Sequence, residues 1–266
     1  MPTNQEKDQE KIQSNSRRTF LKNSGLTVGG LVLGGALGGL LKSDSASSSG
    51  ADHSSHTATA TTANFNQALM YLDKTQFDTI EAAAEQIFPK TDIGPGAKEL
   101  LVAYYIDHQL AGNWGLNTKE YMAAPFKPNQ SVPEMGYQGH LRRQEIFSLG
   151  IEALNKESNK RFKSEDGKKT LNFYELEAEQ QIEILKDFEA DKVKVNGAFK
   201  ASYFFSLLRK ATIEGVYADP LYGGNKDMQG WKMKNFPGHQ MNMKEAAASE
   251  KLVTLKPQSL NSQHKH

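Results

Sequence analysis

The stretch "FKASYFFSLLRKATIEG", from Phe199 to Gly215, decides the fold class of this chain. Its apolar side chains recur at the spacing of an α-helix, and they are dense enough for the helix to be buried among others. We predict that it forms the central, most buried helix, from about Ala198 to Gly215. The rest of the fold then has to supply helices that pack around it.

Four earlier stretches show an apolar stripe of helical period. They run from Thr75 to a stop at Pro89, from about Ala97 to the glycines at 112 and 115, from Gln138 to Asn155, and from about Glu177 to Phe188. Charged residues of these helices, Asp107 and Arg143 among them, are expected to face solvent. No long stretch alternates with period two, so strands should be few. The pattern predicts an all-α fold, a single irregular, orthogonal helical bundle.

The composition divides the chain into four parts and excludes several kinds of chemistry. We expect an export signal over residues 1–45, a flexible Ser/Thr-rich tether over 46–64, the helical domain over 65–247 and a disordered tail over 248–266. A formal net charge of +1 argues against a nucleic-acid partner. The absence of cysteine excludes disulfides, lipid anchoring at a lipobox, thiol catalysis and Cys-ligated iron–sulfur clusters.

The sequence "SRRTFLK" at residues 16–22 matches every position of the twin-arginine export consensus S-R-R-x-F-L-K. Its expected signal residues are Arg17, Arg18, Phe20 and Leu21. The glycine-rich apolar run that follows, residues 26–41, would rise about 24 Å as a helix, which is short of a membrane span. We therefore expect export of a folded protein by the twin-arginine route, to the periplasm or the outer face of the cytoplasmic membrane.

The sequence contains no recognised catalytic motif. No Glu-x-x-His pair, Gly-x-Ser-x-Gly elbow, phosphate-binding loop or dinucleotide-binding glycine motif is present. His53 and His56 lie in the tether and make an incomplete metal site. We therefore predict no catalytic residue, no metal site and no cofactor in this chain.

The aromatic segment, "GVYADPLYGGNKDMQGWKMKNFPGHQM" from Gly215 to Met241, is rich in glycine, proline and aromatic residues and weak in periodicity. Two interpretations follow: a loop folded back over the last helix, or a docking surface for another protein with Tyr222, Trp231 and Phe236 as anchors. The residues alone do not choose between them. The candidate interface residues are Tyr217, Asp219, Pro220, Tyr222, Gly223, Gly224, Trp231, Phe236, Pro237 and Gly238.

The chain resembles the small (gamma) subunit of membrane-bound gluconate 2-dehydrogenase, the subunit 3 family, from about Asp73 to about Gln240. Residues 82–107 and 204–238 carry the resemblance. The most specific part is the run Tyr-x-Asp-Pro-x-Tyr-Gly-Gly-Asn at residues 217–225. The resemblance implies a non-catalytic subunit without a cofactor of its own. It also implies a large, FAD-containing dehydrogenase subunit that oxidises a sugar or sugar acid, and often a cytochrome c subunit that takes the electrons. In such complexes the small subunit carries the export signal, and the large subunit crosses the twin-arginine translocase bound to it.

A different class of function remains open at the level of sequence. A self-standing exported enzyme or small-ligand-binding helical protein would use a pocket between helices. Its most suitable polar groups would be Tyr217, Asp219 and His239.

Overall fold

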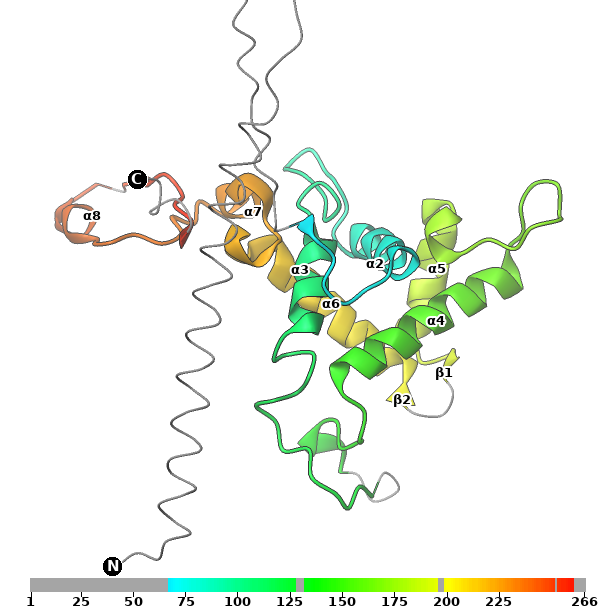
Figure 1. The fold of residues 1–266 in the computed structure, drawn as a ribbon. Helices are drawn as coiled ribbons and strands as arrows, with labels where there is room; N and C mark the ends of the chain where they lie inside the picture. Colours follow the sequence, from blue (N-terminus) through cyan, green and yellow to red (C-terminus); the bar gives the residue numbers. More distant parts are fainter. Residues whose placement is uncertain (1–66, 128–131, 196–198, 252, 261–266) are drawn as a thin grey trace, which may run out of the picture. The chain divides into compact units, whose positions relative to one another are not determined.

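The computed structural model describes residues 67–127, 132–195, 199–251 and 253–260 (Figure 1). The expected signal and tether, with Arg17, Arg18, Phe20 and Leu21, lie outside these residues. The predictions about export therefore remain predictions.

The described residues are mostly helical, which confirms the all-α fold class. The helices are α2 (Lys74–Ile87), α3 (Val102–Ala111), α4 (Arg143–Arg161), α5 (Ala178–Glu189), α6 (Ala201–Tyr217), α7 (Gln229–Met233) and α8 (Lys244–Ala248) (Figure 1). Short 3-10 helices occupy Pro133–Met135, Phe173–Glu175, Pro220–Tyr222 and Lys226–Met228. Two antiparallel strands, β1 (Lys194–Val195) and β2 (Phe199–Lys200), pair Val195 with Phe199 just before α6.

Helix α6 is the centre of the bundle, as its sequence predicts. It packs against α2, α3, α4 and α5, and the side chain of its residue Phe204 is completely buried. The Phe204 ring meets Phe147 of α4 edge-on at a centroid distance of 5.5 Å and Phe188 of α5 at 6.0 Å. These contacts join three helices through one side chain, because aromatic rings bury large areas and prefer tilted pairs.

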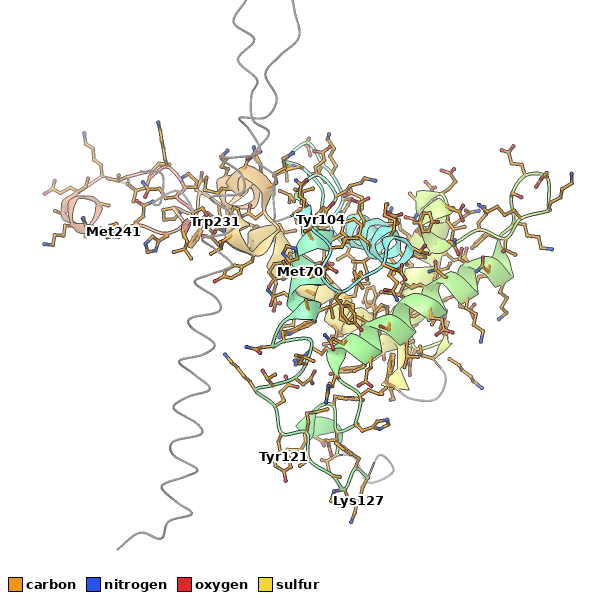
Figure 2. All side chains as sticks on the ribbon, viewed as in Figure 1. Met70, Tyr104, Tyr121, Lys127, Trp231 and Met241 are labelled. Carbon is orange, nitrogen blue, oxygen red and sulfur yellow. The ribbon has the colours of Figure 1, made fainter. Side chains whose placement is uncertain are left out.

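Helix α4 lies later in the chain than predicted, and Arg143 is not a solvent-facing residue. The helix begins at Arg143 because the Glu145 carboxylate accepts a hydrogen bond from the Arg142 backbone N–H at 2.8 Å. The guanidinium of Arg143 lies 4.9 Å from the Trp114 ring centroid and pairs with Glu120. These partners belong to the long connection after α3, which also carries the labelled Tyr121 and Lys127 (Figure 2).

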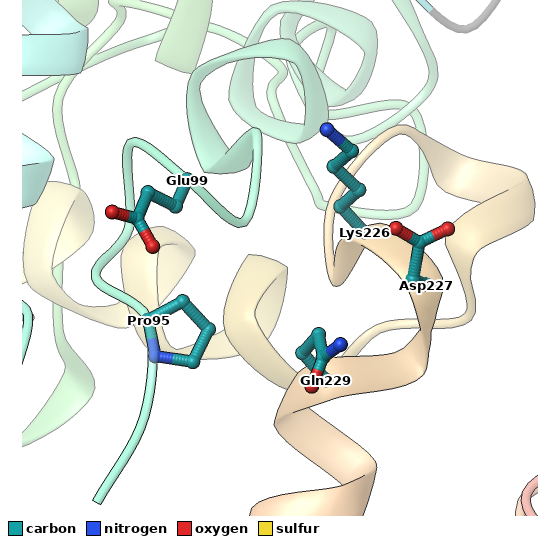
Figure 3. Close-up of a pocket in the computed structure, with 5 residues that line it drawn as sticks. All are labelled: Pro95, Glu99, Lys226, Asp227 and Gln229. Atoms are coloured by element: carbon teal, nitrogen blue, oxygen red, sulfur yellow. The ribbon is translucent and has the colours of Figure 1, made fainter. Parts of the chain in front are cut away.

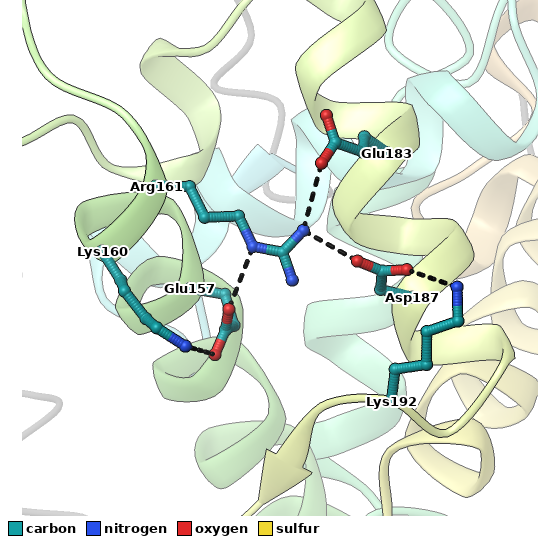
Figure 4. Close-up of polar contacts among 6 residues, drawn as sticks. All are labelled: Glu157, Lys160, Arg161, Glu183, Asp187 and Lys192. Atoms are coloured by element: carbon teal, nitrogen blue, oxygen red, sulfur yellow. Dashed lines mark hydrogen bonds and ion pairs between the residues drawn. The ribbon is translucent and has the colours of Figure 1, made fainter.

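The C-terminal end of α4 is tied to α5 by a group of ion pairs, shown in Figure 4. The Nη1 atom of Arg161 lies 2.8 Å from Asp187 and 3.3 Å from Glu183. Its Nε atom lies 3.1 Å from Glu157 on the previous turn. The hydrogen bond from Arg161 holds the pKa of Asp187 below its ordinary value. The helix therefore continues to Arg161, past the predicted end at Asn155.

The prediction that Asp107 faces solvent is wrong. This α3 residue is completely buried, and its carboxylate accepts hydrogen bonds from three successive backbone N–H groups. The donors are Met70 at 2.6 Å, Tyr71 at 3.0 Å and Leu72 at 2.7 Å. Asp107 thus fixes the chain just before α2. Helix α3 itself begins at Val102 rather than near Ala97, because Leu101 adopts a left-handed conformation with φ of 60°.

Among the described residues, no helix combines the length and apolar character that crossing a bilayer requires.

Candidate interaction site

The aromatic segment leaves α6 through a tight, capped turn. Asp219 is extended, as expected before a proline, and its Oδ1 accepts a hydrogen bond from the Leu221 N–H at 2.9 Å. Gly223 follows with φ of 105°, a conformation that glycine adopts without steric cost. The segment is not irregular throughout, because two 3-10 helices and α7 lie within it.

Asn225 holds the two ends of this turn together from a buried position. Its Nδ2 donates to the Ala218 carbonyl oxygen at 2.7 Å, and its Oδ1 accepts from the Gly230 N–H at 2.7 Å. A Cβ atom at Gly230 would overlap the carbonyl oxygen of Val216. The segment thus lies directly on the end of α6. Residues 225–230 of the segment therefore fold back over α6, which is the first of the two interpretations of this segment.

Trp231 supports the segment from inside and is not an exposed anchor. Its side chain is only 5% exposed, and its indole Nε1 donates to the Tyr217 carbonyl oxygen at 2.7 Å. Its ring meets Phe236 edge-on at 5.4 Å and covers Gly238. Tyr222 and Phe236 remain 48% and 49% exposed. Of the three expected anchors, these two are available to a partner in the described structure.

Part of the expected disordered tail makes specific contacts with this segment. Gln258 accepts a hydrogen bond from the His239 N–H at 2.7 Å and donates one to the Pro237 carbonyl at 3.1 Å. The Ser259 hydroxyl donates to Asp219 Oδ1 at 2.6 Å, and the Leu260 N–H donates to Oδ2 at 3.0 Å. Residues 258–260 therefore contribute contacts to the site. Such short polar contacts leave no periodic pattern in the sequence, so these contacts could not be predicted from it.

Two hollows meet at Tyr217. The acidic hollow has a volume of about 530 Å³ and is lined by Tyr105, Gln109, Glu214, Tyr217, Ala218, Asp219 and Tyr222. The apolar hollow has a volume of about 260 Å³ and is lined by Phe88, Pro89, Thr91, Ile93, Gly94, Pro95, Tyr217, Met233 and Lys234. Burial raises the pKa of Tyr105 to about 12, so its phenol stays neutral at physiological pH. The site is thus a surface with two chemically different depressions.

A third hollow lies between the loop before α3 and the start of α7 (Figure 3). It measures about 500 Å³ and is lined by Pro95, Glu99, Lys226, Asp227 and Gln229. Asp227 has a left-handed backbone with φ of 54°. Its charged lining residues include both acids and a lysine, and Glu99 is already paired with Lys90 at 2.6 Å. This hollow shows no preference for one kind of ligand.

The residues expected for a self-standing enzyme do not converge. Tyr217 and Asp219 line the acidic hollow, whereas His239 is not among its lining residues. The described part of the chain holds no group of three or more His, Asp or Glu side chains placed to bind a metal ion.

The family described as gluconate 2-dehydrogenase subunit 3 matches residues 74–238. The chain belongs to this family. The match begins with the first residue of α2 and ends at Gly238, under the Trp231 ring. It therefore includes the bundle and the candidate interface residues, and it confirms the family that the sequence resembles. Membership in the family implies association with gluconate 2-dehydrogenase subunits. Comparisons with curated proteins and with solved structures find no match for this chain.

Proposed function

We propose that this chain is the non-catalytic small subunit of a membrane-associated, FAD-dependent dehydrogenase that oxidises a sugar or sugar acid. The observation that carries the proposal is the family match, which spans residues 74–238 and ends on the aromatic segment. In this proposal the FAD lies in the large subunit, and a cytochrome c subunit accepts the electrons. The present chain binds the large subunit and supplies no redox group.

The geometry of the aromatic segment supports a docking role. The buried side chains of Asn225 and Trp231 fix its backbone through hydrogen bonds, while Tyr222 and Phe236 stay half exposed. A surface that is ordered before binding loses less conformational entropy on association. Aromatic side chains on such a surface supply contact area at low entropic cost.

The second half of the proposal is escort across the membrane. The Arg17–Arg18 pair would engage the twin-arginine translocase, and the bound flavin subunit would cross with it. The mature complex would then work in the periplasm or at the outer face of the cytoplasmic membrane.

Co-purification tests the docking role. The full chain, tagged at its C-terminus and expressed at its native level, should bring down a flavoprotein whose yellow chromophore survives washing. Recovery of no flavoprotein would contradict the proposal. Turnover of sugar substrates by the chain purified alone would instead favour the self-standing enzyme.

Localisation tests the escort role separately. Replacing Arg17 and Arg18 by lysine keeps the charge but removes the guanidinium groups. Both this chain and its flavin partner should then stay in the cytoplasm, while the complex still forms there. A flavin subunit that reaches the periplasm without this chain would overturn the escort role and leave the docking role intact.

A further inference from the structure

The acidic hollow combines aromatic walls with negatively charged side chains. It lies where α3 and the end of α6 meet the capped turn, and three tyrosines line it: Tyr105, Tyr217 and Tyr222. Two carboxylates, those of Glu214 and Asp219, line it as well, and no Lys, Arg or His is among its lining residues. Its chemistry therefore differs from that of the apolar hollow across Tyr217, which includes Lys234.

The carboxylates of Glu214 and Asp219 can still interact with a cation that enters the hollow. Glu214 forms one long ion pair, with the Nζ of Lys210 at 4.0 Å, and the Lys210 side chain is 72% exposed, so solvent screens this pair strongly. Asp219 accepts hydrogen bonds from Leu221, Ser259 and Leu260, all of them neutral donors. Among the described residues, no cationic side chain forms an ion pair with Asp219. A positive group entering the hollow would thus meet two negative charges.

The tyrosine rings favour the same kind of group. The face of an aromatic ring carries partial negative charge and attracts guanidinium and ammonium groups. Tyr105 is half buried, and both burial and the nearby Glu214 keep its phenol protonated. Tyr222 lines the hollow and is 48% exposed, so its ring is accessible to an inserted side chain.

We infer that the acidic hollow binds a basic side chain of the FAD-containing subunit, and that this side chain is an arginine. This inference rests on the proposed function. The planar guanidinium stacks on a tyrosine ring while its N–H groups bind carboxylates, a combination that lysine cannot reproduce. The neighbouring apolar hollow, around Ile93 and Met233, then takes an uncharged part of the same partner surface.

Variants of Glu214 and Tyr222 test the inference in the co-expressed complex. Glu214 is exposed, so its replacement should leave the fold intact, which circular dichroism of each variant checks. We expect Glu214→Gln to weaken the complex about tenfold and Glu214→Lys about a hundredfold, because the lysine repels the incoming cation. Tyr222→Phe should bind as the wild type does, whereas Tyr222→Ala should bind about tenfold more weakly, since the ring and not the hydroxyl is required.

Glu152→Gln provides the matched control, since Glu152 is an exposed helical glutamate on α4 outside the hollow. It should change the dissociation constant less than twofold. Raising the salt concentration should weaken the wild-type complex more than the Glu214→Gln complex. Equal affinity of the Glu214→Lys and wild-type chains would overturn the basic-side-chain inference while leaving the docking role standing. Failure of the wild-type chain to bind any flavoprotein would overturn both.

Discussion

The indole Nε1 of Trp231 donates a hydrogen bond to the backbone carbonyl oxygen of Tyr217, with 2.7 Å between the two atoms. This bond connects α7 to the last residue of α6 across fourteen positions of sequence. Tyr217 lines both the acidic and the apolar hollow, so the shape of the candidate interface depends on a side chain that lies beneath it. Trp231 therefore supports the candidate interface from within the fold.

The first prediction concerns Trp231. Trp231→Ala should lower the free energy of unfolding by about 3–5 kcal/mol, because a buried ring is replaced by a cavity. Trp231→Phe should cost less, since it keeps most of the ring but leaves the Tyr217 carbonyl without its donor. Urea unfolding followed by far-ultraviolet circular dichroism measures both. Phe236→Ala is the control, and its half-exposed ring should cost about 1 kcal/mol. A Trp231→Ala protein as stable as the wild type would show that the buried ring does not support the segment.

The helices that the sequence predicts best are those whose neighbours are local. Helix α2 begins at Lys74, one residue before the predicted start, because Asp73 and Gln76 form a capping box within one turn. Helix α6 was recognisable because burial on most sides requires an almost continuous apolar surface. Capping boxes and apolar periodicity depend on residues that are close in sequence, so they can be recognised without knowing the fold.

The features that the sequence did not reveal depend on distant partners. Asp107 is charged and looks like a surface residue, yet its three donors lie 35 to 37 positions earlier in the chain. Trp231 could serve equally well in a core or in an interface, because both environments select large aromatic residues. Its burial is decided by Tyr217 and Gly238, which local periodicity cannot place.

The second prediction concerns Asp107. Asp107→Ala should lower the free energy of unfolding by about 3 kcal/mol or more, because the buried N–H of Leu72 and its neighbours lose a charged acceptor. Hydrogen exchange should also show faster exchange at residues 70–72 than in the wild type. Asp92→Ala is the control, since Asp92 is exposed in the turn before α3. Unchanged exchange at residues 70–72 would contradict the anchoring role.

The third prediction is a pH dependence at the junction of α4 and α5. Arg161 lowers the pKa of Asp187, so this carboxylate stabilises the fold above its unfolded-state pKa of about 3.9. That contribution is lost as the pH falls through the lower, folded-state pKa. Arg161→Met should therefore reduce stability by about 1 kcal/mol at neutral pH and by less as the carboxylate becomes protonated.

Thermal unfolding of both proteins between about pH 7 and pH 2 measures this effect. Lys160→Met is the control, because Lys160 is exposed and, among the described residues, forms its ion pair with Glu157 at 3.6 Å and none with Asp187 (Figure 4). A constant stability difference between Arg161→Met and wild type over this range would show that the pair with Asp187 carries no pH-dependent stability.

The fourth prediction compares two asparagines with the same backbone geometry. Asn225 and Asn235 both have left-handed conformations, with φ of 49° and 51°, but only Asn225 is buried. Asn225→Asp replaces the Nδ2 donor with a second acceptor that faces the Ala218 carbonyl oxygen. We expect it to lower the free energy of unfolding by about 2 kcal/mol or more, because a buried charge is left next to an acceptor. Asn235→Asp makes the same chemical change on the surface and should alter stability by less than about 0.5 kcal/mol.

The same two variants should also differ in how much flavoprotein they bring down in co-purification. Asn225→Asp should recover less than Asn235→Asp, since only Asn225→Asp loosens the turn that carries Tyr222. Equal unfolding free energies for the two variants would mean that the buried amide does not hold the turn on α6.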